Sequence, residues 1–168
     1  MSLDILEKRK SIRSYTGKQP TDKELETIIK AAQTSPVANG RFDDYQLTVV
    51  SNPKLLARIE KAVGENAKPL YGAPVEILIA VKTTAASVAQ AASVGIIAHN
   101  LVLAAEDLGL GACYIWGAVR AIEDQAELLE ALEIPQGYKV LGSVIVGETK
   151  ESLNTAKRDD RFKVNYLA

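Results

Sequence analysis

The densest group of potential anion ligands in the sequence lies near its start, at Arg9-Lys10-Ser11-Ile12-Arg13. Arg9, Ser11 and Arg13 alternate, so their side chains would point to the same side of an extended backbone. Two guanidinium groups and a hydroxyl on one side can give a phosphate dianion several charge-assisted hydrogen bonds at once. The alternative is a solvated helix end, where basic side chains complement the helix dipole.

A second basic group, Lys157-Arg158, lies near the other end of the chain. Taken alone, it is typical of a disordered basic tail. Taken with the group at Arg9 to Arg13, it could bind the same anion. The sequence therefore indicates a possible phosphate site formed by both ends of the chain.

Two further segments allow close contact with a ligand. The first, Ser35 to Phe42, is a turn-rich break in which Gly40 permits a close approach of the backbone. The second, Asp107 to Gly117, has two glycines at a helix stop and then a short apolar segment with the only tryptophan. Its glycines do not follow the G-x-G-x-x-G order of a dinucleotide fingerprint. Taken singly, the first is typical of a loop and the second of a helix cap followed by a core strand.

Other chemistries find little support in the residue types present. His99 is the only histidine and lies among apolar residues of a predicted helix, which indicates a core or interface position and argues against histidine metal sites and Ser-His triads. Cys113 is the only cysteine, so there is no internal disulfide. It could be a nucleophile, but the sequence has no second histidine to activate it. The acidic pair Asp43-Asp44 is predicted to be solvated.

The overall composition predicts a soluble, cytoplasmic protein. The 20 basic and 21 acidic side chains leave no surplus that would attract nucleic acid. The apolar stretch around Val94 to Ala105 is too short to span a bilayer, and the N-terminus does not resemble a signal peptide. A single cysteine fits a reducing compartment. We expect neither a membrane nor a nucleic-acid partner.

Hydrophobic periodicity predicts one domain over residues 1–168, in which strands alternate with helices. The Thr21-Asp22-Lys23-Glu24 capping box opens a helix that ends before Pro36. The other predicted helices cover 3–10, 53–63, 87–108 and 119–132, and the predicted strands 45–51, 75–81, 112–116 and 139–147. This alternation favours a flavodoxin-like sheet but leaves the parallel or antiparallel order open. Helix 87–108 is apolar almost all round, so it should be buried on most sides, and its complete burial is easier if a second subunit covers one side.

The joint order of these segments resembles the nitroreductase family of FMN enzymes. The resemblance covers almost the whole chain and rests on Arg9 to Tyr15, Ser35-Pro36, Tyr71-Gly72-Ala73-Pro74, Ala98-His99-Asn100-Leu101 through Gly117, Ile134-Pro135-Gln136-Gly137-Tyr138 and Lys157-Arg158. It implies an α+β fold, with three α/β/α layers and a central, mostly antiparallel sheet, in place of the flavodoxin-like sheet. It also implies a homodimer with two FMN sites at the subunit interface, where helix 87–108 is the central dimer helix.

The resemblance assigns contacts with FMN to particular residues. Phosphate, ribityl and ring contacts would come from Arg9, Lys10, Ser11 and Arg13, with Lys157 and Arg158 completing the phosphate pocket. Asn66 would contact the ring, and Tyr114, Ile115, Trp116 and Gly117 would run along it, partly through the backbone. The loop that contains Pro36, Asn39, Gly40 and Arg41 would reach the FMN held mainly by the other subunit.

That loop departs from the family pattern, which usually runs Pro-Ser-x-x-Asn-x-Gln-Pro. Asn39 stands one place early, and Arg41 occupies the position where glutamine is expected. One hypothesis is that the extra cation favours an anionic substrate. The chain is also short for the family, which implies an open pocket.

The implied activity is a ping-pong reaction in which NADH or NADPH reduces FMN and an electron-poor acceptor, such as a nitroaromatic or a quinone, then reoxidises it. In this mechanism the cofactor carries the chemistry, and the protein supplies binding, orientation and electrostatics. No catalytic acid–base pair is required. Alternatives are a dehalogenase-like flavoenzyme and a non-enzymatic flavin-binding or redox-sensing protein. The sequence determines neither the physiological acceptor nor the preferred nicotinamide.

Overall fold

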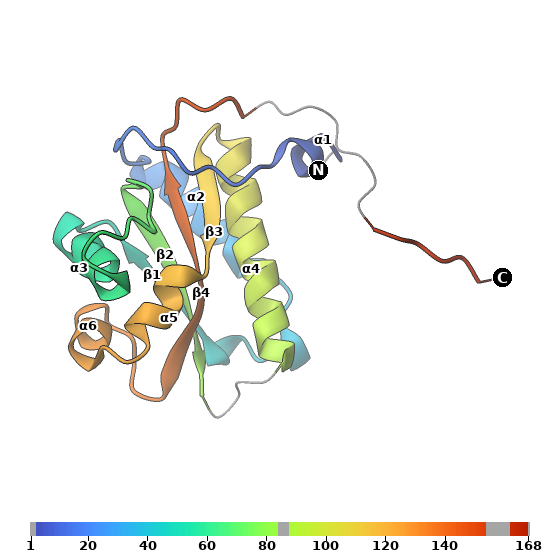
Figure 1. Cartoon of the computed structure of the whole chain (residues 1–168). Helices are drawn as coiled ribbons and strands as arrows, with labels where there is room; N and C mark the ends of the chain where they lie inside the picture. The colour runs from blue at the N-terminus through green and yellow to red at the C-terminus, as the bar shows by residue number, and fades with distance from the viewer. Residues whose placement is uncertain (1–2, 84–87, 154–161, 168) are drawn as a thin grey trace.

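The computed structural model describes residues 3–83, 88–153 and 162–167 and has three layers, with helices on both faces of one sheet (Figure 1). The sheet has four strands in the order β1-β2-β4-β3. Their bounds are β1 (Tyr45–Val50), β2 (Val75–Lys82), β3 (Gly111–Ile115) and β4 (Tyr138–Gly147). Every neighbouring pair is antiparallel. The antiparallel prediction is confirmed, and the flavodoxin-like order is wrong because alternation along the chain does not determine the direction in which each strand enters the sheet.

The alternation of side chains along β2 divides the core into two clusters. Ile77 and Ile79 belong to the cluster that includes residues of α2 (Asp22–Gln33) and α4 (Val88–Asp107). Leu78 and Ala80 belong to the cluster that includes residues of α3 (Pro53–Val63), α5 (Gly117–Ile122) and α6 (Ala126–Ala131). Because β2 is covered on both faces, it is buried along nearly its whole length.

Helix starts follow the local signals in the sequence. Thr21 accepts a hydrogen bond from the backbone N–H of Glu24, whose carboxylate accepts one from the N–H of Thr21 at 2.7 Å. Asn52 caps α3, which has Pro53 in its first turn. The first predicted helix is shorter than expected, since α1 spans Leu3–Lys8 and does not include Arg9 and Lys10.

The helix predicted over 119–132 is wrong as a single element, because the structure has two short helices there. α5 ends at Ile122 and α6 begins at Ala126, and Gln125 between them has non-helical backbone angles. Ile122 and Leu128 are both buried in the same core cluster. The break lets both short helices contribute a buried apolar side chain to this cluster.

The long helix α4 is buried on one side and open on the other. Its length and apolar composition would suit a membrane span, but half of its apolar stretch is buried inside the fold. On the open side Ile96 is 41% exposed and Val88 is 88% exposed, with Ala92, Gly95 and His99 also exposed. Burial on most sides, as predicted, is therefore not reached within one chain, and His99 is not a core residue.

Candidate functional site

The basic segment near the start is extended and lies against β3. Ile12 donates its backbone N–H to the carbonyl of Ala112 at 3.0 Å, and its side chain is fully buried. The Tyr15 hydroxyl donates to the carbonyl of Ile12 at 3.0 Å. Ile12 thus anchors the segment on the sheet, and only its first residue, Arg9, directly follows the end of α1 at Lys8.

Arg9, Ser11 and Arg13 act together on Cys113 of β3. Burial raises the pKa of the Cys113 thiol, and the charge of Arg13, a hydrogen bond with the Ser11 side chain and the charge of Arg9 lower it. Burial also lowers the pKa of His99 on α4, with a smaller contribution from Arg9. All three alternating side chains are therefore near enough to Cys113 to shift its pKa, and Arg9 also influences His99 on α4.

Lys10 pairs with a carboxylate that the sequence did not single out. Its Nζ lies 3.2 Å from Glu151, which also accepts the backbone N–H of Arg13 at 3.2 Å. The hydrogen bond from Arg13 is the main cause of the lowered pKa of Glu151, and Lys10 lowers it further. Within a polar stretch near the C-terminus, nothing in the sequence distinguished Glu151 from its neighbours.

The second basic group, Lys157-Arg158, lies outside the described residues. The chain that leads to it runs beside the basic segment, because Thr149 donates its hydroxyl to the carbonyl of Ser14 at 2.7 Å. Thr16 donates its backbone N–H to the carbonyl of Glu148 at 3.0 Å. The two ends of the chain therefore come together up to this point.

The predicted ring-contact segment lies at the end of β3 and the start of α5. Tyr114 and Trp116 are 40% and 54% exposed, whereas Ile115 is buried in the core. Ile115 can therefore contact a ligand only through its backbone. The Tyr114 ring lies over Gly142, where an added Cβ would stand 2.9 Å from two of its atoms.

Asn66 lies in an exposed turn after α3. Further along the same connection, Tyr71 packs against the basic segment, since the Arg13 guanidinium carbon lies 6.0 Å from the centre of its ring. Tyr71 was part of the family-like Tyr-Gly-Ala-Pro sequence but was not predicted as a site residue. It is the contact that ties the loop before β2 to Arg13.

The loop of Pro36 to Arg41 is not brought to the basic segment within one chain. The 3₁₀ turn η1 (Ala38–Gly40) has positive φ at Asn39 and Gly40, and Ala38 donates its N–H to Ser93 near the start of α4 at 2.9 Å. The basic segment follows α1, which lies at the other end of α4 (Figure 1).

Arg41 is engaged by a buried carboxylate. Its Nε lies 2.6 Å from Asp44, which is 4% exposed and also lies 3.7 Å from Lys82 Nζ. The prediction that Asp44 is solvated is wrong, because its side chain is buried. The two cations beside it supply the opposite charge that a buried carboxylate needs. Two cations share this one carboxylate, so a net positive charge remains on the cluster.

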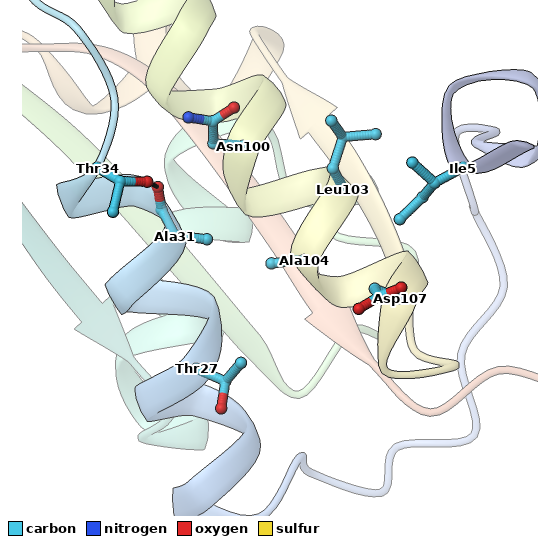
Figure 2. A pocket seen from close by; sticks show the side chains of 8 residues that line it. All are labelled: Ile5, Thr27, Ala31, Thr34, Asn100, Leu103, Ala104 and Asp107. Atoms are coloured by element: carbon cyan, nitrogen blue, oxygen red, sulfur yellow. Dashed lines mark hydrogen bonds between the residues drawn. The ribbon is translucent and has the colours of Figure 1, made fainter. Parts of the chain in front are cut away.

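A groove of about 540 Å³ between α1, α2 and α4 holds none of the predicted site residues. Its lining, shown in Figure 2, consists of Ile5, Thr27, Ala31, Thr34, Asn100, Leu103, Ala104 and Asp107. Thr34 donates to the carbonyl of Ala31 at 2.7 Å, and Asn100 donates to Ser35 at 2.8 Å. These polar groups are used within the fold, so the groove is not our candidate site.

The family model described as "Nitroreductase family" matches residues 6–70 and 64–148. This chain belongs to the nitroreductase family. The match includes the basic segment, the loop of Pro36 to Arg41 and the strands of the sheet. The family resemblance inferred from the motif order is thereby confirmed.

Curated relatives of this nitroreductase-family chain match nearly its whole length. A protein of Archaeoglobus fulgidus provisionally named NADH dehydrogenase/NAD(P)H nitroreductase is 29% identical, over 98% of this chain and 95% of the relative. The FMN reductase [NAD(P)H] of Bacillus subtilis is 29% identical, over 94% of this chain and 69% of the relative.

A solved structure has the same fold. The nitroreductase with bound FMN from Desulfitobacterium hafniense superposes with a TM-score of 0.87 over 100% of both chains, at 23% identity. This likeness confirms the three-layer α+β architecture.

One buried acidic side chain of this family member lies outside the predicted set. Glu76 on β2 is fully buried, and its Oε1 accepts the Ser143 hydroxyl at 2.7 Å. Burial raises the pKa of Glu76 to about 7, while the Ser143 hydrogen bond lowers it. The available signal was a single acid within the otherwise apolar run Val75 to Val81, which sequence reasoning passed over.

Proposed function

We propose that this protein is an FMN-dependent oxidoreductase that uses NADH or NADPH to reduce a small electron-poor acceptor such as a nitroaromatic or a quinone. The observation that carries the proposal is the placement of the basic segment, with Arg9, Ser11 and Arg13, against β3 in a chain of the nitroreductase family. The names of the relatives from Archaeoglobus fulgidus and Bacillus subtilis support the same reaction class.

The donor set at β3 fits the phosphorylated end of FMN. Arg9 and Ser11 supply charged and hydroxyl donors from one extended segment, and Lys10 adds a cation that Glu151 holds 3.2 Å away. We assign Lys157 and Arg158 to the same phosphate. Several such donors are needed because a phosphate dianion presents several strong acceptor oxygens.

The flat ring system of FMN fits beside the segment from Tyr114 to Gly117. Tyr114 and Trp116 offer half-exposed aromatic side chains, and Ile115 and Gly117 offer backbone groups. Asn66 is a further ring contact in this proposal. When bound, FMN supplies the two-electron chemistry, accepting hydride from the nicotinamide and passing electrons to the acceptor. Arg13 contributes a positive charge where negative charge develops on the ring.

We also propose that the protein is a single-domain, cytoplasmic homodimer in which each FMN is shared by two chains. The open face of α4, around Ile96, is an apolar surface that a second copy would cover. In that arrangement Pro36, Asn39, Gly40 and Arg41 reach the FMN of the partner, since in their own chain they lie at the far end of α4. The exposed apolar side chains of Phe162 and Tyr166 suit contact with a second copy as well.

The decisive experiment is a visible absorption spectrum of the purified protein, followed by anaerobic titration with NADH and with NADPH. We expect a bound-flavin spectrum that bleaches on addition of at least one nicotinamide and returns when a quinone is added. A colourless preparation that binds no added FMN contradicts the cofactor assignment. Bound FMN that neither nicotinamide reduces favours the non-enzymatic alternative.

A further inference from the structure

Glu76 is a buried carboxyl group with one oxygen unused. Its Oε1 accepts the Ser143 hydroxyl at 2.7 Å, while its Oε2 is buried with no hydrogen-bond partner among the residues that the structure describes. Burying an ionised carboxylate with an unpaired oxygen is costly. The protonated form is much less costly to bury, and it has an O–H that can donate.

Ser143 lies between Glu76 and the backbone of β3. Its Oγ is 2.7 Å from Glu76 Oε1 and 3.5 Å from the carbonyl oxygen of Ile115. A serine hydroxyl has one proton and two lone pairs, so it donates fully to only one of these acceptors at a time. An ionised Glu76 takes that proton in a charge-assisted bond. A protonated Glu76 can donate to Ser143 instead, which leaves the Ser143 proton for Ile115.

Ile115 is the last residue of β3, and Gly117 begins α5. The Ile115 carbonyl therefore belongs to the backbone turn that carries the half-exposed Tyr114 and Trp116. A hydrogen bond to this carbonyl restrains the turn from behind, on the core side.

Few charged groups face Glu76. From α3, Glu60 raises the pKa of Glu76 by its negative charge, and Glu60 itself lies 3.2 Å from Lys68 Nζ. The buried residues of α5 are apolar. Cys113 of β3 and Tyr15 pack in the same cluster, and burial raises the pKa of both, so both are neutral near pH 7. Ionisation of Glu76 near neutrality is therefore governed first by burial, then by the Ser143 hydrogen bond and then by Glu60.

We propose that Glu76 is a positioning residue for the cofactor: its protonated carboxyl, acting through Ser143, holds the Ile115 carbonyl and with it the segment from Tyr114 to Gly117. Ionisation of Glu76 withdraws the Ser143 proton from Ile115 and weakens FMN binding. The inference rests on the proposed function, which places FMN against this segment.

The test compares the FMN dissociation constant of the full-length apoprotein and of Glu76→Gln across neutral pH, by flavin fluorescence. Glutamine stays neutral and can still donate to Ser143. Relative to the variant, the wild-type dissociation constant should rise about five-fold between about pH 6 and pH 8, the factor for one neutral hydrogen bond. Using the ratio cancels the ionisation of the FMN phosphate, which affects both proteins equally.

Two further variants separate the relay from a general structural effect. Ser143→Ala should bind FMN at every pH as weakly as the wild type does at high pH, and so lose the pH dependence, because the hydroxyl that links Glu76 to Ile115 is gone. Glu60→Gln should move the inflection to lower pH, because Glu60 raises the pKa of Glu76. The infrared band of a protonated carboxyl in the apoprotein should disappear at the same pH and be absent from Glu76→Gln.

The outcomes are distinguishable. A wild-type protein that binds no FMN at any pH overturns the proposed function and this inference with it. FMN binding with the same pH dependence in wild type and Glu76→Gln overturns only this inference. If Glu76→Gln does not fold, Glu60→Gln supplies the test. An FMN dissociation constant whose inflection lies at the same pH in Glu60→Gln as in the wild type then overturns this inference.

Discussion

Arg13 is the residue on which the electrostatics of the candidate site converge. Its guanidinium lies over the Tyr71 ring, and its charge is the main influence that lowers the pKa of Cys113 against burial. Its backbone N–H donates separately to Glu151, so truncating the side chain leaves that anchor in place. The side chain is therefore available for a ligand without being needed to hold the segment.

We predict that Arg13→Ala weakens FMN binding by about 1.5–3 kcal/mol, the range for a hydrogen bond to a charged group, and slows reduction by the nicotinamide. Fluorescence titration and stopped-flow absorbance measure the two effects. Arg58→Ala on α3, which removes an arginine that bonds only to the carbonyl of Glu127 among the contacts described, is the matched control. An Arg13→Ala protein that retains its full flavin and its rate contradicts the assigned role.

Glu76 should make the stability of the protein depend on pH. Its pKa is raised from 4.5 to about 7 in the folded state, so the folded state binds a proton more tightly than the unfolded state. The free energy of unfolding should therefore fall by about 3 kcal/mol as pH rises from about 4.5 to about 7, and change no further above that range. Urea unfolding at several pH values measures the slope. Glu76→Gln should remove this contribution, and an equal slope in both proteins would mean that Glu76 does not titrate there.

The pairing of β3 with β4 places the aromatic part of the candidate site. Gly142 on β4 leaves room for both the Tyr114 ring and the Val94 side chain, each within 3 Å of where a Cβ would stand. Tyr114 is half exposed and can move, but Val94 is held in the buried side of α4. Small size at this position is thus a condition for the observed position of Tyr114.

We predict that Gly142→Ala lowers the free energy of unfolding by about 1–3 kcal/mol through overpacking and displaces the Tyr114 ring. Chemical denaturation of the apoprotein and the intrinsic fluorescence of the protein report the two effects. Gly117→Ala is the control for stability, since a Cβ there meets no described atom within 4 Å. Equal stability of the two variants would show that the space over Gly142 is not restrictive.

The helix boundaries that have a local capping or proline signal were predictable from the sequence, and the boundary without such a signal was not. The capping box at Thr21 and the proline at Pro53 act within one turn, so the starts of α2 and α3 follow from the sequence. The break between α5 and α6 depends on tertiary packing, which places Ile122 and Leu128 in one core cluster. No residue near Gln125 is a proline or a glycine that would have announced it.

At the scale of the whole molecule, the open face of α4 is exposed in a single chain and would be covered in the proposed dimer. Ile96 lies in the middle of this face and is 41% exposed. Val63, on α3, has almost the same exposure, 37%, but belongs to another layer. The two residues therefore separate the effect of a partner from the effect of an exposed apolar side chain.

We predict that Ile96→Glu weakens dimer formation by at least about 3 kcal/mol, because it would bury an unpaired charge in the interface, and that FMN is lost with the dimer. Sedimentation velocity over a range of protein concentrations measures the change. Val63→Glu should leave both association and FMN content unaltered. An Ile96→Glu protein that sediments and binds FMN as the wild type does would remove α4 from the interface.

The amino-acid sequence by itself determined most of the element types, the motif order that led to the family and the alternation of Arg9, Ser11 and Arg13 along the basic segment. These depend on periodicity and short-range spacing, which any single chain displays. Lys157 and Arg158 stay predictions on the same basis. Only the tertiary structure decided the strand order β1-β2-β4-β3, the pairing of Lys10 with Glu151, the burial of Asp44 and the contact of Glu76 with Ser143. The reason is physical. The Lys10–Glu151 and Glu76–Ser143 pairs join residues far apart in the chain, and strand register and layer packing determine which distant residues meet.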